Sequence, residues 1–595
     1  MNHLRMPLLL SLILMFFAIT LVGCGSSDPG GEADADGKRR LVFISNEEHN
    51  SRDPQRITWT QDIRLADCLF EPLVVADYAT MTLLPGVAER WEQSEDGLTY
   101  TFHLRENARW SNGDPVTSRD FVYAWRRAML PDVAAGYAQL LFVIRGAEDF
   151  FNFRASQIDQ YAKEQAAGSA EAPTAEALWA EAQARFTATV GLETPDGRTL
   201  VVHLKEPTPF FLDLAAFGTF MPVHQTSVDA ATSMVEATGS LTMDTAYWSD
   251  PERLIVNGPY VLKEAAFRQH NDLEPNPMYW DAASVRNNGI RERIIDDTGS
   301  ALFAYQSGEV HYWPRVPTGS PVTADLASSA DRDDVHVQSM AGTFFVNINT
   351  LPKLWDGRDN PLADARVRQA LSMTIDRKEL VERVTRMNEP VARTFVPPGV
   401  VAGYDPPTEA APGYDPETAK TLLAEAGYPN AQGLTGLSIL YRAGTGEEQI
   451  VQAIRRMWEE KLGLSVKLEG LENRVVVDRV INREFTIARG SWYGDYPDPT
   501  TWLDRLRKPV GKSGNNASGW DHPPFDALLN QAATELDPTK RLAMLRDAEA
   551  MMIEQQPLIV LFHYVSVNLF DPDRVEGIAN NPWFRERLHL VRVKP

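Results

Sequence analysis

The sequence predicts an α/β protein, because strands and amphipathic helices alternate along its second half. Residues 449–462 have the apolar period of a helix, and an alternating strand over 464–468 follows directly. An amphipathic helix is expected over 364–384, and another helix over 538–554 precedes the apolar strand 558–562. Units of strand, helix and strand build sheets that are covered by helices, which gives the predicted class.

The first half of the chain predicts a smaller sheet. The turn Asp96-Gly97 leads into residues 99–104, where apolar and polar side chains alternate as in a half-buried strand. Residues 196–204 repeat the same pattern, Asp-Gly-x-Thr-x-x-x-His-Leu, so we expect both strands in one sheet. Between them, residues 120–127 predict a helix, with an acid in the first turn and bases in the last.

An insertion is expected within this first half. Residues 154–186 are rich in Ala, Glu and Gln, and the pattern is interrupted at Gly168 and Pro173. Glycine and proline end helices, so the segment predicts two exposed helices on the surface of one domain.

The N-terminus predicts export from the cytoplasm. A basic start precedes the apolar run 7–22, and the run ends in Leu-Val-Gly before Cys24. This order is typical of a signal peptide, here 1–23, and its end resembles the lipobox of bacterial lipoproteins, with lipidation at Cys24. The alternative is an uncleaved anchor helix. The polar residues 24–39 then predict a flexible tether, and the folded part begins with a buried strand over 41–44.

Composition excludes several classes of function. The net charge of −23 opposes binding to nucleic acids, whose phosphates are also negative. If Cys24 carries lipid, Cys68 is the single remaining thiol, so no internal disulfide forms and a Cys-rich zinc site is excluded. We expect Cys68 to be a buried core thiol, and we expect no metal and no cofactor.

Four blocks of sequence resemble a known family. They read LPGVAERW at 84–91 with WSNGDPVT at 110–117, NGPY at 257–260 with PNPMYW at 275–280, ARVRQAL at 365–371, and SWYGDYPDP at 491–499. Together and in this order they resemble the peptide-binding proteins of bacterial ABC importers, over most of the chain from about residue 41.

The resemblance implies a two-lobed, hinged fold of the periplasmic-binding-protein type (type II) with an extra α+β domain on the first lobe. Such lobes close over a ligand. The first lobe is expected to comprise 40–70, 225–337 and 562–595. The extra domain is expected over 71–224, with the helical insertion near 154–186, and the second lobe over 338–561.

The resemblance also implies a site for the peptide amine. Asp495 matches the family's amine-binding aspartate, and Trp492 and Tyr493 lie beside it in the sequence. Aromatic faces around an ammonium exclude water and strengthen its ion pair. The alternative is that Asp495 is a solvated carboxylate in a turn.

Further residues are expected around the ligand. Arg489 stands where family members carry a cation for the ligand carboxylate, and Arg479 is a second candidate. Tyr137 and Tyr564 match tyrosines that line the family's pocket. Each of these four side chains has an ordinary alternative role, as a surface arginine or as a core aromatic.

One departure from the family concerns a second acid near the amine. By counting from Asp53-Pro54, that position is Thr58 here, and Trp59 and Thr60 follow. We expect this segment to be a strand that offers backbone groups to the ligand. The missing charge places more of the amine recognition on Asp495 and leaves room for a dipeptide, a modified peptide or a non-peptide solute.

The resemblance thus implies a monomeric lipoprotein of the periplasm or cell surface that binds peptides and delivers them to a permease driven by separate ATPase subunits. Its membrane contact would be the N-terminal lipid alone. No enzyme is expected: Gly-x-Ser-x-Gly is absent, and Gly511-Lys512-Ser513 lacks the earlier glycine of a phosphate loop, because Leu506 stands there. The alternatives are a hydrolase that uses acids such as Asp495 and Asp498, and a chaperone-like surface protein.

Overall fold

A computed structural model describes residues 30–594 except 78, 79, 81, 169–172, 330, 331, 509–515, 580 and 584. The expected signal peptide over 1–23, Cys24 and the Gly511-Lys512-Ser513 motif lie outside the described residues. In the part of the chain that the structure does describe, no helix is both long and apolar enough to cross a bilayer.

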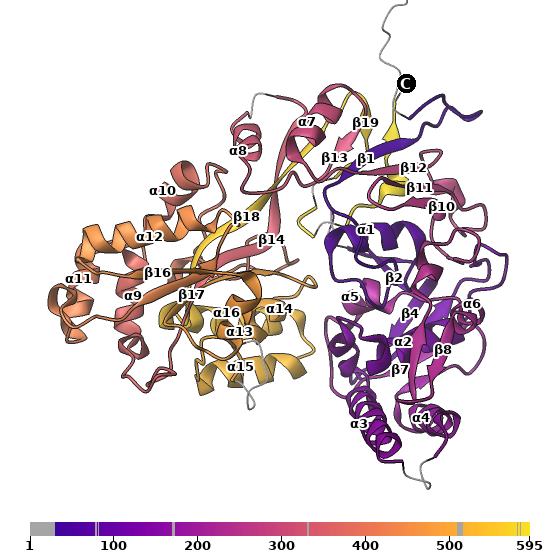
Figure 1. The fold of residues 1–595 in the computed structure, drawn as a ribbon, viewed down its shortest axis with the longest axis horizontal. Coiled ribbons are helices and arrows are strands. Elements are labelled where there is room, and N and C mark those ends of the chain that lie inside the picture. The colour runs from indigo at the N-terminus through magenta and orange to yellow at the C-terminus, as the bar shows by residue number, and fades with distance from the viewer. Residues whose placement is uncertain are drawn as a thin grey trace, which may run out of the picture.

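A mixed sheet of ten strands forms the framework of the molecule (Figure 1). The strand order is β10 (Tyr260–Ala266), β11 (His270–Pro275), β12 (Ile290–Ile294), β1 (Leu41–Ser45), β13 (Tyr312–Trp313), β18 (Leu558–Phe570), β14 (Val335–Ile348), β17 (Ile487–Tyr493), β15 (Ser438–Arg442) and β16 (Lys467–Leu471). We call the end with β10 to β13 and β1 the first lobe, and the end with β17, β15 and β16 the second lobe.

Two long strands, β14 and β18, connect the lobes (Figure 1). They pair antiparallel, but the register breaks between the pairs Ser339–Val565 and Thr343–His563, so three residues of β14 lie opposite Tyr564. A break in the ladder removes hydrogen bonds that would stiffen it. The ladder that joins the two lobes is therefore interrupted at this place.

The smaller sheet predicted for the first half is present. Its antiparallel order is β4 (Ala88–Gln93), β5 (Thr99–Leu104), β7 (Thr199–His203) and β6 (Leu192–Glu193). The predicted pairing of β5 with β7 is confirmed, with Thr99 opposite His203. The predicted helix is α2 (Ser118–Ala128), where Thr117 and Asp120 form a capping box. With α3 and α4, described next, we call this region the small domain.

The insertion consists of two helices, α3 (Ala147–Ala166) and α4 (Ala175–Thr189). The expectation that both are simply exposed is wrong for α3. Its Arg154 is fully buried and donates hydrogen bonds to Asp132 at 2.9 and 3.1 Å and to the carbonyl of Gly239 at 2.7 Å. Buried charges need such partners, so α3 is tied into the small domain.

The second lobe contains the predicted helices α12 (Glu447–Leu462) and α16 (Pro538–Gln555). The single helix expected over 364–384 is interrupted. It ends as α9 (Ala365–Met373), and α10 (Arg377–Glu379) starts anew because the Asp376 carboxylate accepts a hydrogen bond from the Glu379 amide at 3.0 Å. An aspartate in this role caps a new helix start in place of continuing the old one.

Cys68 lies in α1 (Thr60–Leu69) and is 3% exposed, as predicted for a core thiol. Burial raises the pKa of this thiol well above its usual value. The neutral thiol therefore acts as a small apolar group at this position.

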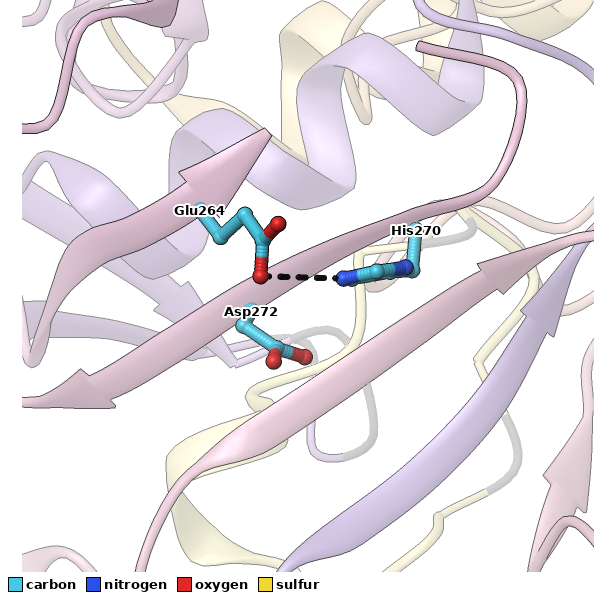
Figure 2. A group of neighbouring side chains, drawn as sticks. All are labelled: Glu264, His270 and Asp272. Carbon is cyan, nitrogen blue, oxygen red and sulfur yellow. Dashed lines mark hydrogen bonds and ion pairs between the residues drawn. The ribbon is translucent and has the colours of Figure 1, made fainter. Parts of the chain in front are cut away.

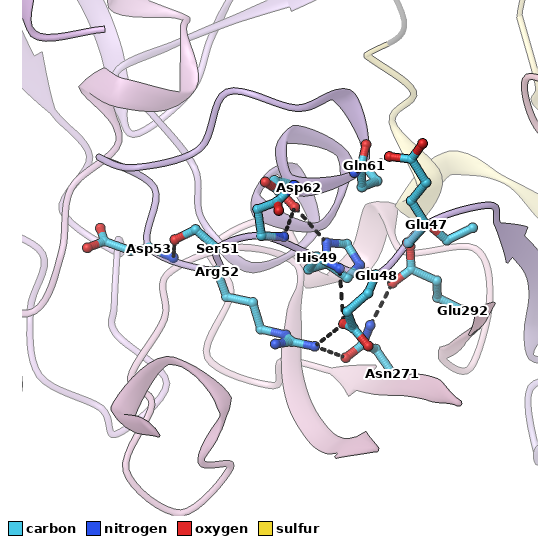
Figure 3. A network of polar contacts seen from close by, with 12 residues as sticks. Glu47, Glu48, His49, Ser51, Arg52, Asp53, Gln61, Asp62, Asn271 and Glu292 are labelled. Atoms are coloured by element: carbon cyan, nitrogen blue, oxygen red, sulfur yellow. Dashed lines mark hydrogen bonds and ion pairs between the residues drawn. The ribbon is translucent and has the colours of Figure 1, made fainter. Parts of the chain in front are cut away.

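A buried charge cluster stabilises the first lobe next to α1 (Figure 3). His49 Nδ1 lies 3.2 Å from Asp62 Oδ1, and His49 Nε2 lies 2.7 Å from Glu292 Oε2, with all three side chains closed off from solvent. Burial opposes the imidazolium charge, but Glu292 and Asp62 outweigh burial and raise the pKa of His49 to about 9.

This cluster predicts a pH-dependent stability. The folded-state pKa of His49 exceeds the unfolded value, so its contribution is full below pH 6.5 and is lost as the pH rises through about 9. Relative to His49→Gln, the wild type should lose on the order of 3 kcal/mol of unfolding free energy between pH 6 and 9.5. Urea denaturation at several pH values measures this. A difference between the two proteins that does not change with pH would contradict a charged His49.

Candidate functional site

Asp495 follows the end of β17 in a tightly fixed turn. The amide of Gly494 donates to the Ala341 carbonyl at 2.8 Å, and the amide of Asp495 donates to Thr501 Oγ1 at 3.0 Å. A Cβ at position 494 would lie 2.5 Å from the Trp502 ring, so glycine is required there. These contacts fix the backbone of the turn that carries the Asp495 side chain.

The Asp495 carboxylate lies between the second lobe and the small domain. The hydroxyl of Tyr137 donates a hydrogen bond to Asp495 Oδ1 at 3.2 Å, and Tyr137 belongs to the segment that leads into the short helix η2 (Ala138–Val143). Burial raises the pKa of Asp495 to about 6, although the Tyr137 hydroxyl and the nearby Arg505 charge favour the carboxylate. Asp495 and Tyr137, two separately predicted ligand-binding residues, are thus in contact.

The next residues pack the same two parts of the molecule together. The Tyr496 ring stacks on Phe210 of the small domain with centroids 4.7 Å apart. Tyr496 is buried in one apolar cluster with Tyr100 and Phe211 of the small domain. Tyr496 therefore serves packing, and the aromatic residue in contact with the Asp495 carboxylate is Tyr137.

Asp498 is occupied by structural contacts. Its carboxylate accepts from Arg541 of α16 at 2.6 and 2.9 Å and from the amide and hydroxyl of Thr500 at 3.0 and 2.6 Å. A carboxylate with four such donors is fully engaged in contacts within the protein. The contacts of Asp498 with Arg541 and Thr500 therefore do not favour Asp495 and Asp498 as a pair of catalytic acids.

The side chains of Trp492 and Tyr493 contact different residues. The guanidinium of Arg505 lies over the Trp492 ring, with its Cζ 3.9 Å from the centroid. The Tyr493 ring stacks on Tyr564 at 4.8 Å, and a Cβ on Gly342 would lie 2.4 Å from it. The predicted residues Tyr493 and Tyr564 therefore meet at the register break between β14 and β18.

The two arginines proposed for the ligand carboxylate already bind acids of the protein. Arg489 Nε lies 2.6 Å from Glu447 Oε1, and Arg479, in α13 (Asn473–Ile481), binds Glu469 at 2.8 Å. Arg479 also donates to the Glu484 carbonyl. The structure thus places Arg479 apart from Asp495, in contacts within the second lobe.

The expectation of a strand at Thr58, Trp59 and Thr60 is wrong. Thr60 opens α1, and Trp59 precedes it with extended backbone angles and a side chain that is 55% exposed. The amide of Ile63 donates to the Trp59 carbonyl at 3.0 Å, so the helix hydrogen bonds take up this backbone. Thr58 nevertheless lies close to the Tyr137 segment, because a Cβ on Gly136 would be 2.3 Å from its Cγ2.

The site contains an arginine that the sequence did not indicate. Arg505 lies beyond the end of the resembling block at 491–499, and nothing in its neighbourhood sets it apart from a surface arginine. Only the chain reversal through α14 (Thr500–Leu503) and η10 (Asp504–Leu506) brings it over Trp492.

One cluster has residue types that bind metals (Figure 2). Donor atoms of Glu264, His270 and Asp272 lie within 4.8 Å of one another on β10 and β11. However, Asp272 accepts from Arg291 at 2.7 Å and lies 3.5 Å from Arg40. These two cations already neutralise the buried carboxylate, so we assign no metal to the cluster.

Two cavities lie in or beside the small domain. One, of about 350 Å³, is lined among others by Arg126, Trp179 and Met243. The second, of about 260 Å³, is lined by Asp213, Pro497 and other residues of the small domain and second lobe. Neither is lined by Asp495, so the site is assigned by its chemistry and not by cavity size.

Comparisons with known proteins cover most of the chain. The model of the bacterial extracellular solute-binding proteins, family 5 (Middle), matches residues 82–514. The oligopeptide-binding protein OppA of Bacillus subtilis is 30% identical over 578 residues, 95% of this chain and 95% of that protein.

Two solved structures extend the comparison to the fold. The murein tripeptide-binding protein MppA in its unliganded open form matches with a TM-score of 0.74 at 30% identity, covering 93% of this chain and 97% of that chain. OppA of Haemophilus influenzae in complex with the peptide RPPGFSPFR matches with a TM-score of 0.67 at 25% identity, covering 94% and 100%. The predicted two-lobed fold is confirmed by these likenesses.

Proposed function

Because the chain belongs to the bacterial extracellular solute-binding proteins of family 5, we propose that it captures small peptides and delivers them to the permease of an ABC importer. The observation that carries this proposal is Asp495, a partly buried carboxylate between the second lobe and the small domain. Its relatives, named as an oligopeptide-binding protein and a murein tripeptide-binding protein, support the same class of ligand.

Asp495 has the properties that a peptide amine requires. An ammonium taken out of water needs an anion with little water around it, because the attraction is stronger where the dielectric is low. The Tyr137 hydroxyl contacts the Asp495 carboxylate from the small domain, and the Trp492 ring lies under Arg505, whose charge favours that carboxylate. An arriving ammonium would exchange the Tyr137 hydroxyl contact for a charge-assisted one.

The connection of the lobes supports capture by closure. Only the strands β14 and β18 of the large sheet run through both lobes, and their register breaks opposite Tyr564. Closure around a bound peptide would then bend the sheet at this break, with Tyr493 and Tyr564 stacked on it.

The proposed partners follow from export. We propose lipid attachment through Cys24, a location in the periplasm or on the cell surface, and a monomer that docks on permease subunits with separate ATPases. The lipobox-like end of the apolar run supports the attachment. Catalysis is not proposed, because Asp498 is occupied by Arg541 and Thr500, and the relatives are named as binding proteins.

A thermal-shift experiment tests this function. Purified protein is heated with a pool of tripeptides and with the same pool after N-acetylation, which removes the ammonium. Free-amine peptides should raise the melting temperature and acetylated ones should not, because only a ligand of the folded state shifts unfolding. Stabilisation by non-peptide solutes alone would contradict the proposal.

The site predicts that affinity falls in acid. Asp495 binds an ammonium only as a carboxylate, and its pKa in the free protein is about 6. Between pH 7.5 and 6 the peptide affinity should change little, and below pH 6 it should fall by up to about tenfold per pH unit as protons compete. Titration calorimetry from pH 4.5 to 7.5 measures this. In Tyr137→Phe, which lacks the hydroxyl that favours the carboxylate, the fall should begin at higher pH.

A further inference from the structure

Arg505 has an unusual position among the arginines around the site. Its guanidinium lies over the Trp492 ring, with Cζ 3.9 Å from the ring centroid. It donates no hydrogen bond to, and forms no ion pair with, any residue in the described ranges. By contrast, Arg489 and Arg541 each bind a carboxylate of the protein.

The donors of this pair lack acceptors. The Trp492 indole N–H is closed off from solvent and has no partner among the described residues. Arg505 is half-buried, and burial lowers the pKa of its guanidinium to about 10. Guanidinium is weakly hydrated and presents parallel N–H groups that match a carboxylate, so a stacked, partly desolvated arginine suits an anionic group of a ligand.

Arg505 is also electrostatically coupled to Asp495. Its charge favours the Asp495 carboxylate, although the two groups are too far apart for an ion pair. An ammonium bound at Asp495 would then lie close to a second positive charge, which repels it. A negative group on the ligand, bound to Arg505, offsets this repulsion and leaves two neighbouring pairs of opposite charge.

We propose that Arg505 and the Trp492 ring beneath it form an anion subsite beside Asp495, so that the preferred ligands are peptides whose first residue is Asp or Glu. This inference rests on the proposed function. An acidic first residue carries its carboxylate only a few bonds from the α-ammonium, so one residue of the ligand can reach Asp495 and Arg505 together. The subsite differs from a site for the peptide's C-terminal carboxylate, which would lie further along the ligand.

Titration calorimetry with matched peptides tests the subsite. Glu-Ala-Ala is compared with Gln-Ala-Ala, and Glu-Ala-Ala-Ala-Ala with Gln-Ala-Ala-Ala-Ala, so that each pair differs only in charge. The wild type should bind the Glu peptides at least about tenfold more tightly. Arg505→Met, which keeps an apolar chain over Trp492, should abolish the difference and bind the Gln peptides no more weakly than the wild type.

Two further variants control the result. Arg455→Met removes a positive charge from the exposed face of α12 and should keep the wild-type preference. Arg505→Lys keeps the charge without the planar fork and should keep a reduced preference.

The outcomes separate the two proposals. Equal binding of Glu and Gln peptides by the wild type, or a preference that persists in Arg505→Met, overturns the subsite while the peptide receptor stands. No binding of any of the four peptides overturns the proposed function and the subsite together. A preference that is lost in Arg505→Met and kept in Arg455→Met supports the subsite.

Discussion

Asp495→Asn should weaken the binding of a free-amine peptide by about 2–5 kcal/mol, or roughly 30- to 4,000-fold in Kd. The amide keeps the size of the side chain and its contact with Tyr137. It removes the negative charge expected to pair with the ammonium, which is then buried without that counter-ion. Titration calorimetry with Ala-Ala-Ala, or with Glu-Ala-Ala for tighter binding, gives the two dissociation constants.

Two controls show whether the charge itself is responsible. Asp478→Asn, on the exposed side of α13, removes an acid from the same lobe and should leave the affinity unchanged. An N-acetylated peptide should bind the wild type and Asp495→Asn about equally, because it has no ammonium to lose. Wild-type affinity for free-amine peptides in Asp495→Asn would refute the assignment of the amine site.

Arg541→Met should destabilise the folded protein by about 3–5 kcal/mol. Arg541 is 4% exposed and Asp498 is 6% exposed, so the methionine leaves the Asp498 charge buried without its main counter-ion. Burial and the nearby Asp498 charge raise the pKa of Asp213 to about 7, and Arg541 opposes this rise, so the variant also removes a cation near Asp213. The free energy of unfolding from urea denaturation measures the effect.

The same helix provides the matched control. Arg546, also on α16, forms an exposed ion pair with Glu409. Arg546→Met breaks this pair and should leave the free energy of unfolding nearly unchanged. The double variant Arg541→Met with Asp498→Asn should be more stable than Arg541→Met alone, since no buried charge is left unpaired. Equal losses in Arg541→Met and Arg546→Met would show that the buried pair is not needed for the fold.

Arg541→Met should also weaken peptide binding in protein that remains folded. Asp498 fixes Thr500, and the following Thr501 accepts from the amide of Asp495. The turn that orients Asp495 is thus connected to Arg541 through two short links. A loosened turn costs affinity because the carboxylate is no longer held ready for the ammonium.

Elements with strong local signals could be predicted from the sequence. The helix α12 and the paired strands β5 and β7 are examples, because periodicity and turn residues determine them within a few positions. The end of β18 could not be predicted. The apolar run stops at Phe562, but the strand continues to Phe570, because β14 supplies partners on both sides of the register break, from Leu558 to Leu569.

Some contacts of the candidate site could likewise be predicted from the sequence, and others could not. Asp495 and Tyr137 were predicted separately, and the fold brings them together at 3.2 Å. The ion pair of Arg489 with Glu447 could not be predicted, because the two residues are distant in the chain. The fold brings together α12, which carries Glu447, and β17, which carries Arg489. Arg505 was missed for the same reason, since only the chain reversal after residue 499 places it over Trp492.

The central claim is that the two lobes enclose a peptide whose positive end is bound by Asp495. A crystal structure of the protein with Glu-Ala-Ala tests it most directly. We predict the peptide nitrogen within hydrogen-bonding distance of the Asp495 carboxylate, in a space enclosed by both lobes and the small domain. A complex in which the peptide binds elsewhere, with Asp495 still in contact only with Tyr137 and solvent, would contradict the claim.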